Sequence, residues 1–365
     1  MPTSFDIAAS TGRYPVDIAM GSLDALLARQ DGDHVFMVDA FLRDRVVAAG
    51  INPIVIAADE AAKSLDRMTD IIVALRDRGA TRGTTLVAIG GGVVQDAAAF
   101  AASVYMRGLK WVYVPTTLLA MTDSCIGGKS SINVGIYKNL VGTIHPPQRV
   151  VVDPDLAGTL SAEQVAAGLC EAAKICLCRG TDYIDRYIAL DPSVESSPAD
   201  LEKIVKLSLS GKKWFIEVDE FDRAERLILN FGHTFGHALE AASHFGVGHG
   251  IAVGLGMLAA IDMAVALHPQ AKTPEITAFR RHIGTLLTSV DGLDDVLATV
   301  DLDVLMKAFD SDKKHDRDYY AVILPNAEGQ IERRLLPRTD ETRRALQQAA
   351  ATMLTPTAEQ TKLAA

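Results

Sequence analysis

The sequence predicts an α/β domain with a parallel sheet, followed by a mostly α-helical domain. Short β-branched runs alternate with helix-like segments in the first half of the chain, whereas long helical periods dominate the second half. The 365 residues also exceed what one ordinary hydrophobic core accommodates, so two domains are expected. We place the domains at residues 1–160 and 161–355, and we expect the polar tail at 356–365 to fray.

Five apolar runs in the first domain are predicted strands. They lie at residues 34–38, 53–57, 85–89, 111–114 and 150–152. Runs such as LVAIG and VVVD show no polar alternation, which is typical of parallel strands that helices cover on both faces. Strands that alternate with helices in this way indicate a Rossmann-like domain.

The second domain is predicted from segments such as SAEQVAAGLCEAAKICL and RLILNFGHTFGHALEAASHF, which have helical periodicity. The apolar stretch 251–267 contains Asp262 and several small residues, so we expect a buried helix rather than a membrane span. Near the end, residues 319–337 indicate two strands joined by a turn at 326–329.

The composition excludes some classes of function. A net charge of −10 argues against binding to nucleic acid or to an anionic membrane, because both require a positive surface. The start, MPTSFDIAAS, lacks a basic segment followed by an apolar core, so we expect no secretory signal and a cytoplasmic location. The four cysteines lack paired CxxC spacing and are expected to be reduced, buried side chains.

A glycine-rich turn follows the predicted strand 85–89. Gly90, Gly91 and Gly92 precede an alanine-rich helix that contains Asp96. Glycines let a backbone approach a pyrophosphate closely, and the amides at a helix start favour its negative charge. The spacing is not GxGxxG, so a plain tight turn is the alternative.

A polar segment, residues 115–147, contains lysines and asparagines among glycines and hydroxyls. Lys129, Lys138 and Asn139 offer the charge and amide donors that bind phosphate. Solvated surface lysines are the alternative. The same two interpretations apply to Asp312, Lys313 and Lys314 in the sequence DSDKKHDRD.

The second domain carries a carboxylate and a cluster of histidines. Glu171 and Lys174 share a helix face in an apolar context, and a buried charge requires a partner or a metal. Asn230, His233, His237 and His249 follow within one short segment. Histidines combined with a carboxylate form open three-ligand zinc sites, and core packing is the alternative for these side chains.

Taken in order, these motifs resemble the 3-dehydroquinate synthase family of sugar-phosphate cyclases. The matching motifs are ExxKS at 60–64, GGGVxxD at 90–96, YMRG at 105–108, VPTTLLA at 114–120, DSxxGGK at 123–129, KN at 138–139, GLxExxK at 168–174, DE at 219–220, NFGHTFGHA at 230–238, HG at 249–250 and DKK at 312–314. They span most of the chain.

The resemblance implies a set of site residues. It makes Glu171, His233 and His249 the ligands of a divalent metal, Zn or Co. It places NAD against Asp39, Glu60, Lys63, Gly90, Gly91, Gly92, Val93, Asp96, Thr116, Thr117, Asp123 and Lys138. Its catalytic positions are Asp123, Lys129, Lys174, Lys212, Arg226, Asn230 and His237, and its further substrate positions are Arg107, Asn139, Lys313 and Lys314. Arg107 is expected to reach in from a second subunit, which implies a homodimer.

The activity that the resemblance implies is conversion of 3-deoxy-arabino-heptulosonate 7-phosphate to 3-dehydroquinate and phosphate. Arg226 favours this substrate, since a planar guanidinium suits a carboxylate. A sibling cyclase that acts on another sugar phosphate is the main alternative. A metal-dependent polyol dehydrogenase and an inactive scaffold are more remote alternatives. Gln95 and Ile251 depart from the family's usual small residue and glutamate. We expect Gln95 to have the bulk to alter the nucleotide turn, and Ile251 to remove an acceptor near His249.

Overall fold

The computed structural model describes residues 3–29, 32–135 and 137–358, and the chain divides into two compact units. Unit 1 comprises Met1–Leu160, Ser197–Glu202 and Lys213–Phe221, and unit 2 comprises Ser161–Ser196, Lys203–Lys212 and Asp222–Ala365. The boundary expected at residue 160 had kept all of helix α7 (Pro198–Val218) in the second domain. Its carboxyl end groups with unit 1 because Glu217 and Glu220 accept hydrogen bonds from the backbone of Ala8 and Ser10 (2.9 and 2.7 Å).

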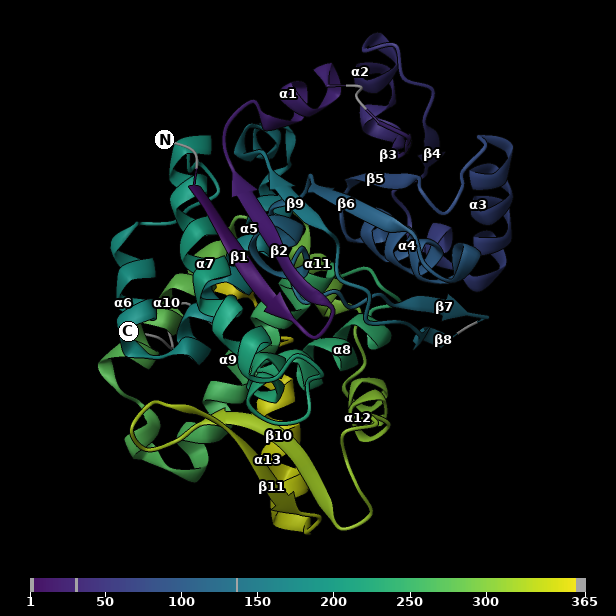
Figure 1. Cartoon of the computed structure of the whole chain (residues 1–365). Coiled ribbons are helices and arrows are strands. Elements are labelled where there is room, and N and C mark those ends of the chain that lie inside the picture. Colours follow the sequence, from purple (N-terminus) through teal and green to yellow (C-terminus); the bar gives the residue numbers. More distant parts are fainter. Residues whose placement is uncertain (1–2, 30–31, 136, 359–365) are drawn as a thin grey trace. The chain divides into compact units, whose positions relative to one another are not determined.

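Unit 1 contains a seven-stranded sheet in the order β1-β2-β9-β6-β5-β3-β4 (Figure 1). Its strands are β1 (Thr3–Ala9), β2 (Gly12–Ile18), β3 (His34–Asp39), β4 (Ile54–Ile56), β5 (Thr85–Gly90), β6 (Lys110–Pro115) and β9 (Arg149–Val152). β1 and β2 form an antiparallel hairpin, and the other neighbouring strands are parallel. The five predicted strands and the α/β class are confirmed, whereas the hairpin β1–β2 was not anticipated.

Short helices and a second, two-stranded sheet complete unit 1. They are α1 (Ser22–Ala28), η1 (Ala40–Leu42), α2 (Arg43–Ala48), η2 (Glu60–Lys63), α3 (Leu65–Asp77), α4 (Gly92–Val104), η3 (Tyr105–Arg107), the π-helical η4 (Ala120–Ser124), β7 (Ile132–Val134), β8 (Tyr137–Val141) and η5 (Pro154–Thr159). β5 is buried along its whole length, as its unbroken apolar run predicted.

Unit 2 is mostly helical and is built around α9 (Figure 1). Its elements are α5 (Ala162–Arg179), α6 (Thr181–Ala189), η6 (Glu225–Asn230), α8 (His233–Ala242), α9 (His249–Leu267), η7 (Pro269–Ala271), α10 (Pro274–Thr288), α11 (Leu293–Ala298), α12 (Leu302–Asp310), β10 (Tyr319–Pro325), β11 (Ile331–Pro337) and α13 (Asp340–Thr352). α9 contacts α5, α8, α10 and α13. The predicted hairpin near the end is confirmed as the antiparallel pair β10–β11.

Helix α9 is the one described helix whose length and composition would allow it to cross a membrane. However, 78% of its apolar window is buried inside the protein, which matches the predicted core helix. All four cysteines are free and buried, as expected. The expectation of fraying is wrong at the start of the tail, because Thr357 is buried and its N–H donates to Asp294 Oδ1 (2.9 Å). Residues 359–365 lie outside the described residues.

Candidate functional site

The candidate nucleotide residues lie at the carboxyl ends of three adjacent parallel strands. Asp39 ends β3, Gly90 ends β5, and Thr116 follows β6. The Thr116 N–H donates to Gly90 O (3.1 Å), which joins the second and third of these ends. β4 lies on one side of β3 and β5 on the other, so the strand order reverses between β3 and β5. Open α/β sheets bind ligands at such a reversal, outside the carboxyl ends of the strands.

The glycine turn is shaped for close approach. Gly91 caps the amino end of α4, and a Cβ there would lie 2.9 Å from Thr117 Cγ2. A Cβ at Gly92 would meet nothing within 4 Å. The start of α4 therefore has no side chain at Gly92 and open space beside that residue, which suits the close approach of a phosphate to a helix start.

The expectation that Gln95 alters this turn is wrong. Its backbone N–H donates to Gly91 O (3.0 Å) in the regular helical pattern. Its buried side chain points to the π-helix η4, where Nε2 donates to Ser124 O (2.8 Å) and Oε1 accepts from Ser124 Oγ (2.6 Å). Gln95 thus ties α4 to the segment that carries Asp123.

Lys63 joins several of the predicted residues into one network. Its ammonium lies 2.9 Å from Asp96 Oδ2, 3.2 Å from Glu60 Oε1 and 3.0 Å from Asn139 Oδ1. Lys138 lies 3.9 Å from the same oxygen of Glu60. Burial alone would lower the pKa of Lys63, but the charges of Asp96 and Glu60 outweigh burial and raise that pKa. Asn139 was expected to bind the substrate, but its side chain contacts Lys63, which was expected to bind NAD.

Asn133 is a member of this network that the motifs did not reveal. Its buried side chain donates to Glu60 O (3.2 Å) and Glu60 Oε1 (3.0 Å) and accepts from the N–H of Asn139 (2.9 Å). Asn139 has φ 53°, a left-handed conformation that this bond supports. An asparagine in a short apolar strand carries no sequence signal for such a role.

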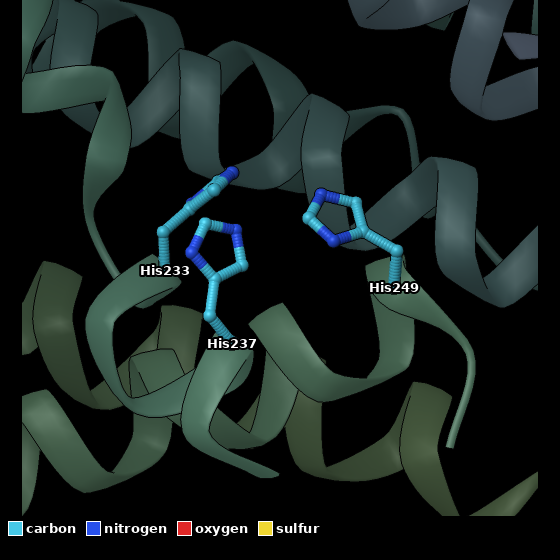
Figure 2. A group of neighbouring side chains, drawn as sticks. All are labelled: His233, His237 and His249. Atoms are coloured by element: carbon cyan, nitrogen blue, oxygen red, sulfur yellow. The ribbon is translucent and has the colours of Figure 1, made fainter. Parts of the chain in front are cut away.

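The candidate metal centre lies in unit 2, where side chains from α5, α8 and α9 converge. Figure 2 shows the rings of His233, His237 and His249 turned toward one another, with one nitrogen of each lying within 4.8 Å of the others. Glu171 Oε1 lies 3.8 Å from His233 Nε2 and 3.7 Å from His249 Nε2. Ligand atoms about 2.1 Å from one tetrahedral ion lie about 3.4 Å apart, so this spacing fits a shared ion.

Lys174 orients the Glu171 carboxylate. Both side chains are buried, and Lys174 Nζ donates to Glu171 Oε2. The other carboxylate oxygen, Oε1, is the one that faces the two imidazoles. One carboxylate oxygen of Glu171 therefore binds Lys174, and the other faces His233 and His249.

The pKa values of the three histidines shift in different directions. Burial, helped by the nearby Lys174, holds the pKa of His233 well below its usual range. Burial and the Lys314 ammonium lower the pKa of His237 to about 4. Burial would also lower the pKa of His249, but its hydrogen bond to Glu240 and the charge of that carboxylate raise it. At neutral pH the first two imidazoles are neutral, the form in which an imidazole binds a metal.

The remaining predicted residues are either buried or paired within unit 2, or exposed. Lys212 and Arg226 are buried in unit 2, Asn230 Nδ2 donates to Leu227 O (3.0 Å), and Lys314 Nζ pairs with Asp312 Oδ2 (3.2 Å). The exposed residues are Arg107, Lys129, Lys138, Asn139 and Lys313. Val93 lies in the first turn of α4.

Glu240 is the second functional residue that the motifs missed. His249 Nδ1 donates to Glu240 Oε2 (3.0 Å), so the acceptor expected to be lost with Ile251 is supplied from α8. Ile251 itself is buried. A signal was present in the sequence, because Glu240 follows His237 by three residues and therefore shares its helix face.

Comparisons with known proteins show the family to which the chain belongs. The family described as "3-dehydroquinate synthase N-terminal" matches residues 53–167, and "3-dehydroquinate synthase C-terminal" matches residues 168–315. The 3-dehydroquinate synthase of Xanthomonas oryzae pv. oryzae (strain PXO99A) is 39% identical over 281 residues, which cover 70% of this chain and 75% of the relative. The chain belongs to the 3-dehydroquinate synthase family.

Two solved structures extend the similarity to sibling members of the family's fold. A 2-deoxy-scyllo-inosose synthase complexed with carbaglucose-6-phosphate, NAD+ and Co2+ has a TM-score of 0.82 and 25% identity, and the match covers 96% of this chain and 99% of the other. The 2-epi-5-epi-valiolone synthase of Streptomyces hygroscopicus subsp. jinggangensis 5008, with NAD+ and Zn2+ bound, has a TM-score of 0.77 and 25% identity, covering 93% and 96%. The family's fold class is thus confirmed.

Proposed function

We propose that this protein is a 3-dehydroquinate synthase that converts 3-deoxy-arabino-heptulosonate 7-phosphate to 3-dehydroquinate and phosphate. The observation that carries the proposal is the convergence of Glu171, His233 and His249 in a chain of this family. The reaction is redox-neutral overall: one hydroxyl is transiently oxidised, phosphate is eliminated, the ketone is reduced again, and an intramolecular aldol reaction closes the ring.

The side chains described above fit the two groups that this chemistry requires. Glu171 Oε1 and the two Nε2 atoms provide one carboxylate and two imidazole ligands, and the open space at Gly92 and the Lys63 network fit a dinucleotide. When bound, NAD supplies reversible hydride transfer and a zinc or cobalt ion polarises the substrate hydroxyl. His237 is better assigned to the substrate phosphate, because the Lys314 charge beside it favours an anion.

The protein's own groups hold one flexible substrate through successive steps, which is catalysis by proximity and orientation. We assign the phosphate to Lys129, His237, Lys313 and Lys314. The buried Arg226 would hold the substrate carboxylate, and Asp123, Lys174, Lys212 and Asn230 would hold its hydroxyls. Lys174 also keeps Glu171 oriented throughout.

We also propose that the enzyme is a cytoplasmic homodimer in which Arg107 reaches the partner's site. Met106 and Arg107 are consecutive non-glycine residues with positive φ (48° and 69°), and both are exposed. Backbone strain of this kind is concentrated at functional sites, which supports a functional role for Arg107.

The test is phosphate release by the purified, zinc- or cobalt-loaded protein with catalytic NAD and 3-deoxy-arabino-heptulosonate 7-phosphate, with the product identified by mass and NMR. Multiple turnovers that yield dehydroquinate are expected. Net NADH accumulation without phosphate release would indicate a polyol dehydrogenase instead, and a protein that binds no metal would indicate a scaffold.

A sibling cyclase is the second candidate, favoured by the similarity to the two solved sibling enzymes. Glucose 6-phosphate and sedoheptulose 7-phosphate are therefore assayed in parallel. Phosphate release from one of them, with none from the heptulosonate, would select this alternative.

A further inference from the structure

The Glu240 carboxylate lies behind His249, on the side of the ring away from the cluster. Glu240 Oε2 accepts from His249 Nδ1 at 3.0 Å, and the Glu240 side chain is only 15% exposed. The opposite ring nitrogen, Nε2, is the atom that lies 3.7 Å from Glu171 Oε1. The hydrogen bond thus places the ring proton on Nδ1 and leaves Nε2 free to bind a cation.

His249 needs this support more than His233 does. His249 is the first residue of α9 and its side chain is 39% exposed, whereas the His233 side chain is 14% exposed. The ring of His233 is also held through Nδ1, by the backbone carbonyl of Phe231 (3.2 Å). Packing therefore restrains the His233 ring, whereas the His249 ring depends on its hydrogen bond to Glu240.

The helix α8 aligns Glu240 with the cluster. Glu240 follows His237 by three residues and His233 by seven, spacings that return to one helix face. The carboxylate and two imidazoles thus come from one rigid element, and the third imidazole is fastened to that element from α9.

We propose that Glu240 is a positioning residue for the metal ligand His249, and that it tightens metal binding by fixing the ring and by making Nε2 more basic. A histidine that ligates a metal gains affinity when its other nitrogen donates to a carboxylate. The inference rests on the metal assignment of the proposed function and adds a residue that binds neither metal nor substrate.

The test compares Glu240→Leu, which removes the acceptor at similar size, with Glu240→Gln, which keeps an acceptor oxygen but removes the charge. The dissociation constant for Co²⁺ is measured on the purified, metal-free chain by competition with a chelator, together with the visible spectrum of the bound Co²⁺. Glu275→Gln, in the first turn of α10, is the matched control.

We expect Co²⁺ affinity to fall about 10- to 100-fold in Glu240→Leu and several-fold in Glu240→Gln, with a changed spectrum in the first and no change in the control. If Glu240→Leu does not fold, as judged by circular dichroism, Glu240→Gln decides the question. Wild-type affinity and spectrum in the folded variants would overturn the inference. A wild-type chain that binds no Co²⁺ would overturn the metal assignment itself, and the inference with it.

Discussion

The two oxygens of Glu171 have different partners, so its loss should have two separable effects. Glu171→Gln removes the anionic ligand and also the countercharge of the buried Lys174. We expect this variant to lose bound metal and turnover, and its metal-free form to be less stable by about 3 kcal/mol. His233→Ala should lose metal with a smaller change in stability, because the ion pair remains.

Elemental analysis and urea unfolding of the metal-free proteins measure these effects. Full turnover in either variant would contradict the metal assignment. Equal stability of metal-free Glu171→Gln and wild type would show that the ion pair with Lys174 is energetically neutral.

The Gln95 side chain should stabilise the segment that carries Asp123. Gln95→Ala removes both hydrogen bonds to Ser124, and the partly buried Ser124 carbonyl then loses this donor. We expect a loss of about 2 kcal/mol in the free energy of unfolding and weaker NAD binding. Ser124→Ala removes only one of the two hydrogen bonds and should lose less stability. Urea unfolding and NAD titration measure both variants. Wild-type stability and NAD affinity in Gln95→Ala would refute this role of Gln95.

At the scale of elements, glycines set the distance between α8 and α9. A Cβ at Gly256 would lie 2.1 Å from Gly232 O and 2.7 Å from Gly236 N, and backbone atoms cannot move aside cheaply. We expect Gly256→Ala to destabilise the fold by more than about 3 kcal/mol, since overpacking must displace a helix. Its control is Gly158→Ala, where a Cβ meets nothing within 4 Å and where stability should change by less than about 1 kcal/mol.

Thermal or urea unfolding of the two glycine variants decides this prediction. Similar stabilities would mean that α8 and α9 separate easily. In that case, the imidazoles that the two helices bring together would not be held by close backbone packing.

Helix α10 introduces a pH dependence through His282, whose Nε2 pairs with the Tyr187 hydroxyl (3.0 Å). Burial lowers the pKa of His282 from 6.5 to about 4. Between pH 6.5 and 4 the unfolded chain therefore binds a proton at His282 that the folded chain does not bind. The contribution of the neutral His282 to the free energy of unfolding is complete above pH 6.5 and is lost as the pH falls toward 4. The loss should reach about 3 kcal/mol at pH 4.

His282→Gln keeps a hydrogen-bond partner for Tyr187 but cannot titrate. Urea unfolding at several pH values should give a flatter profile for this variant than for the wild type between pH 6.5 and 4. Parallel profiles would show that His282 is not the group responsible.

At the scale of the whole molecule, the candidate metal ligands belong to unit 2, and the candidate nucleotide residues belong to unit 1. We therefore expect removal of the metal with a chelator to abolish phosphate release while NAD affinity changes by less than about threefold, because no nucleotide residue loses its own contacts. Isothermal titration of NAD into the metal-free and metal-loaded protein measures this. A large loss of NAD affinity in the metal-free protein would show that the two sites are coupled.

Much of the architecture could be predicted because local patterns control it. Unbroken apolar runs marked the buried parallel strands, and helical periods marked unit 2. The hairpin β1–β2 was not predicted because both of its strands are only partly buried, so they lack the unbroken apolar runs that marked the parallel strands. The grouping of the carboxyl end of α7 with unit 1 could not be predicted either, since it depends on contacts with Ala8 and Ser10, which lie more than two hundred residues away in the sequence.

The sequence by itself determined the kinds of group that the protein offers: a glycine turn after a buried strand, and a carboxylate with histidines on helices. Tertiary structure alone decided their partners. It set Glu240 behind His249, turned Gln95 toward Ser124, and linked Asn139 to Lys63 through a bend stabilised by Asn133. The reason is physical: helix and strand periodicity follow from neighbouring residues, whereas hydrogen bonds between distant side chains depend on how the elements pack.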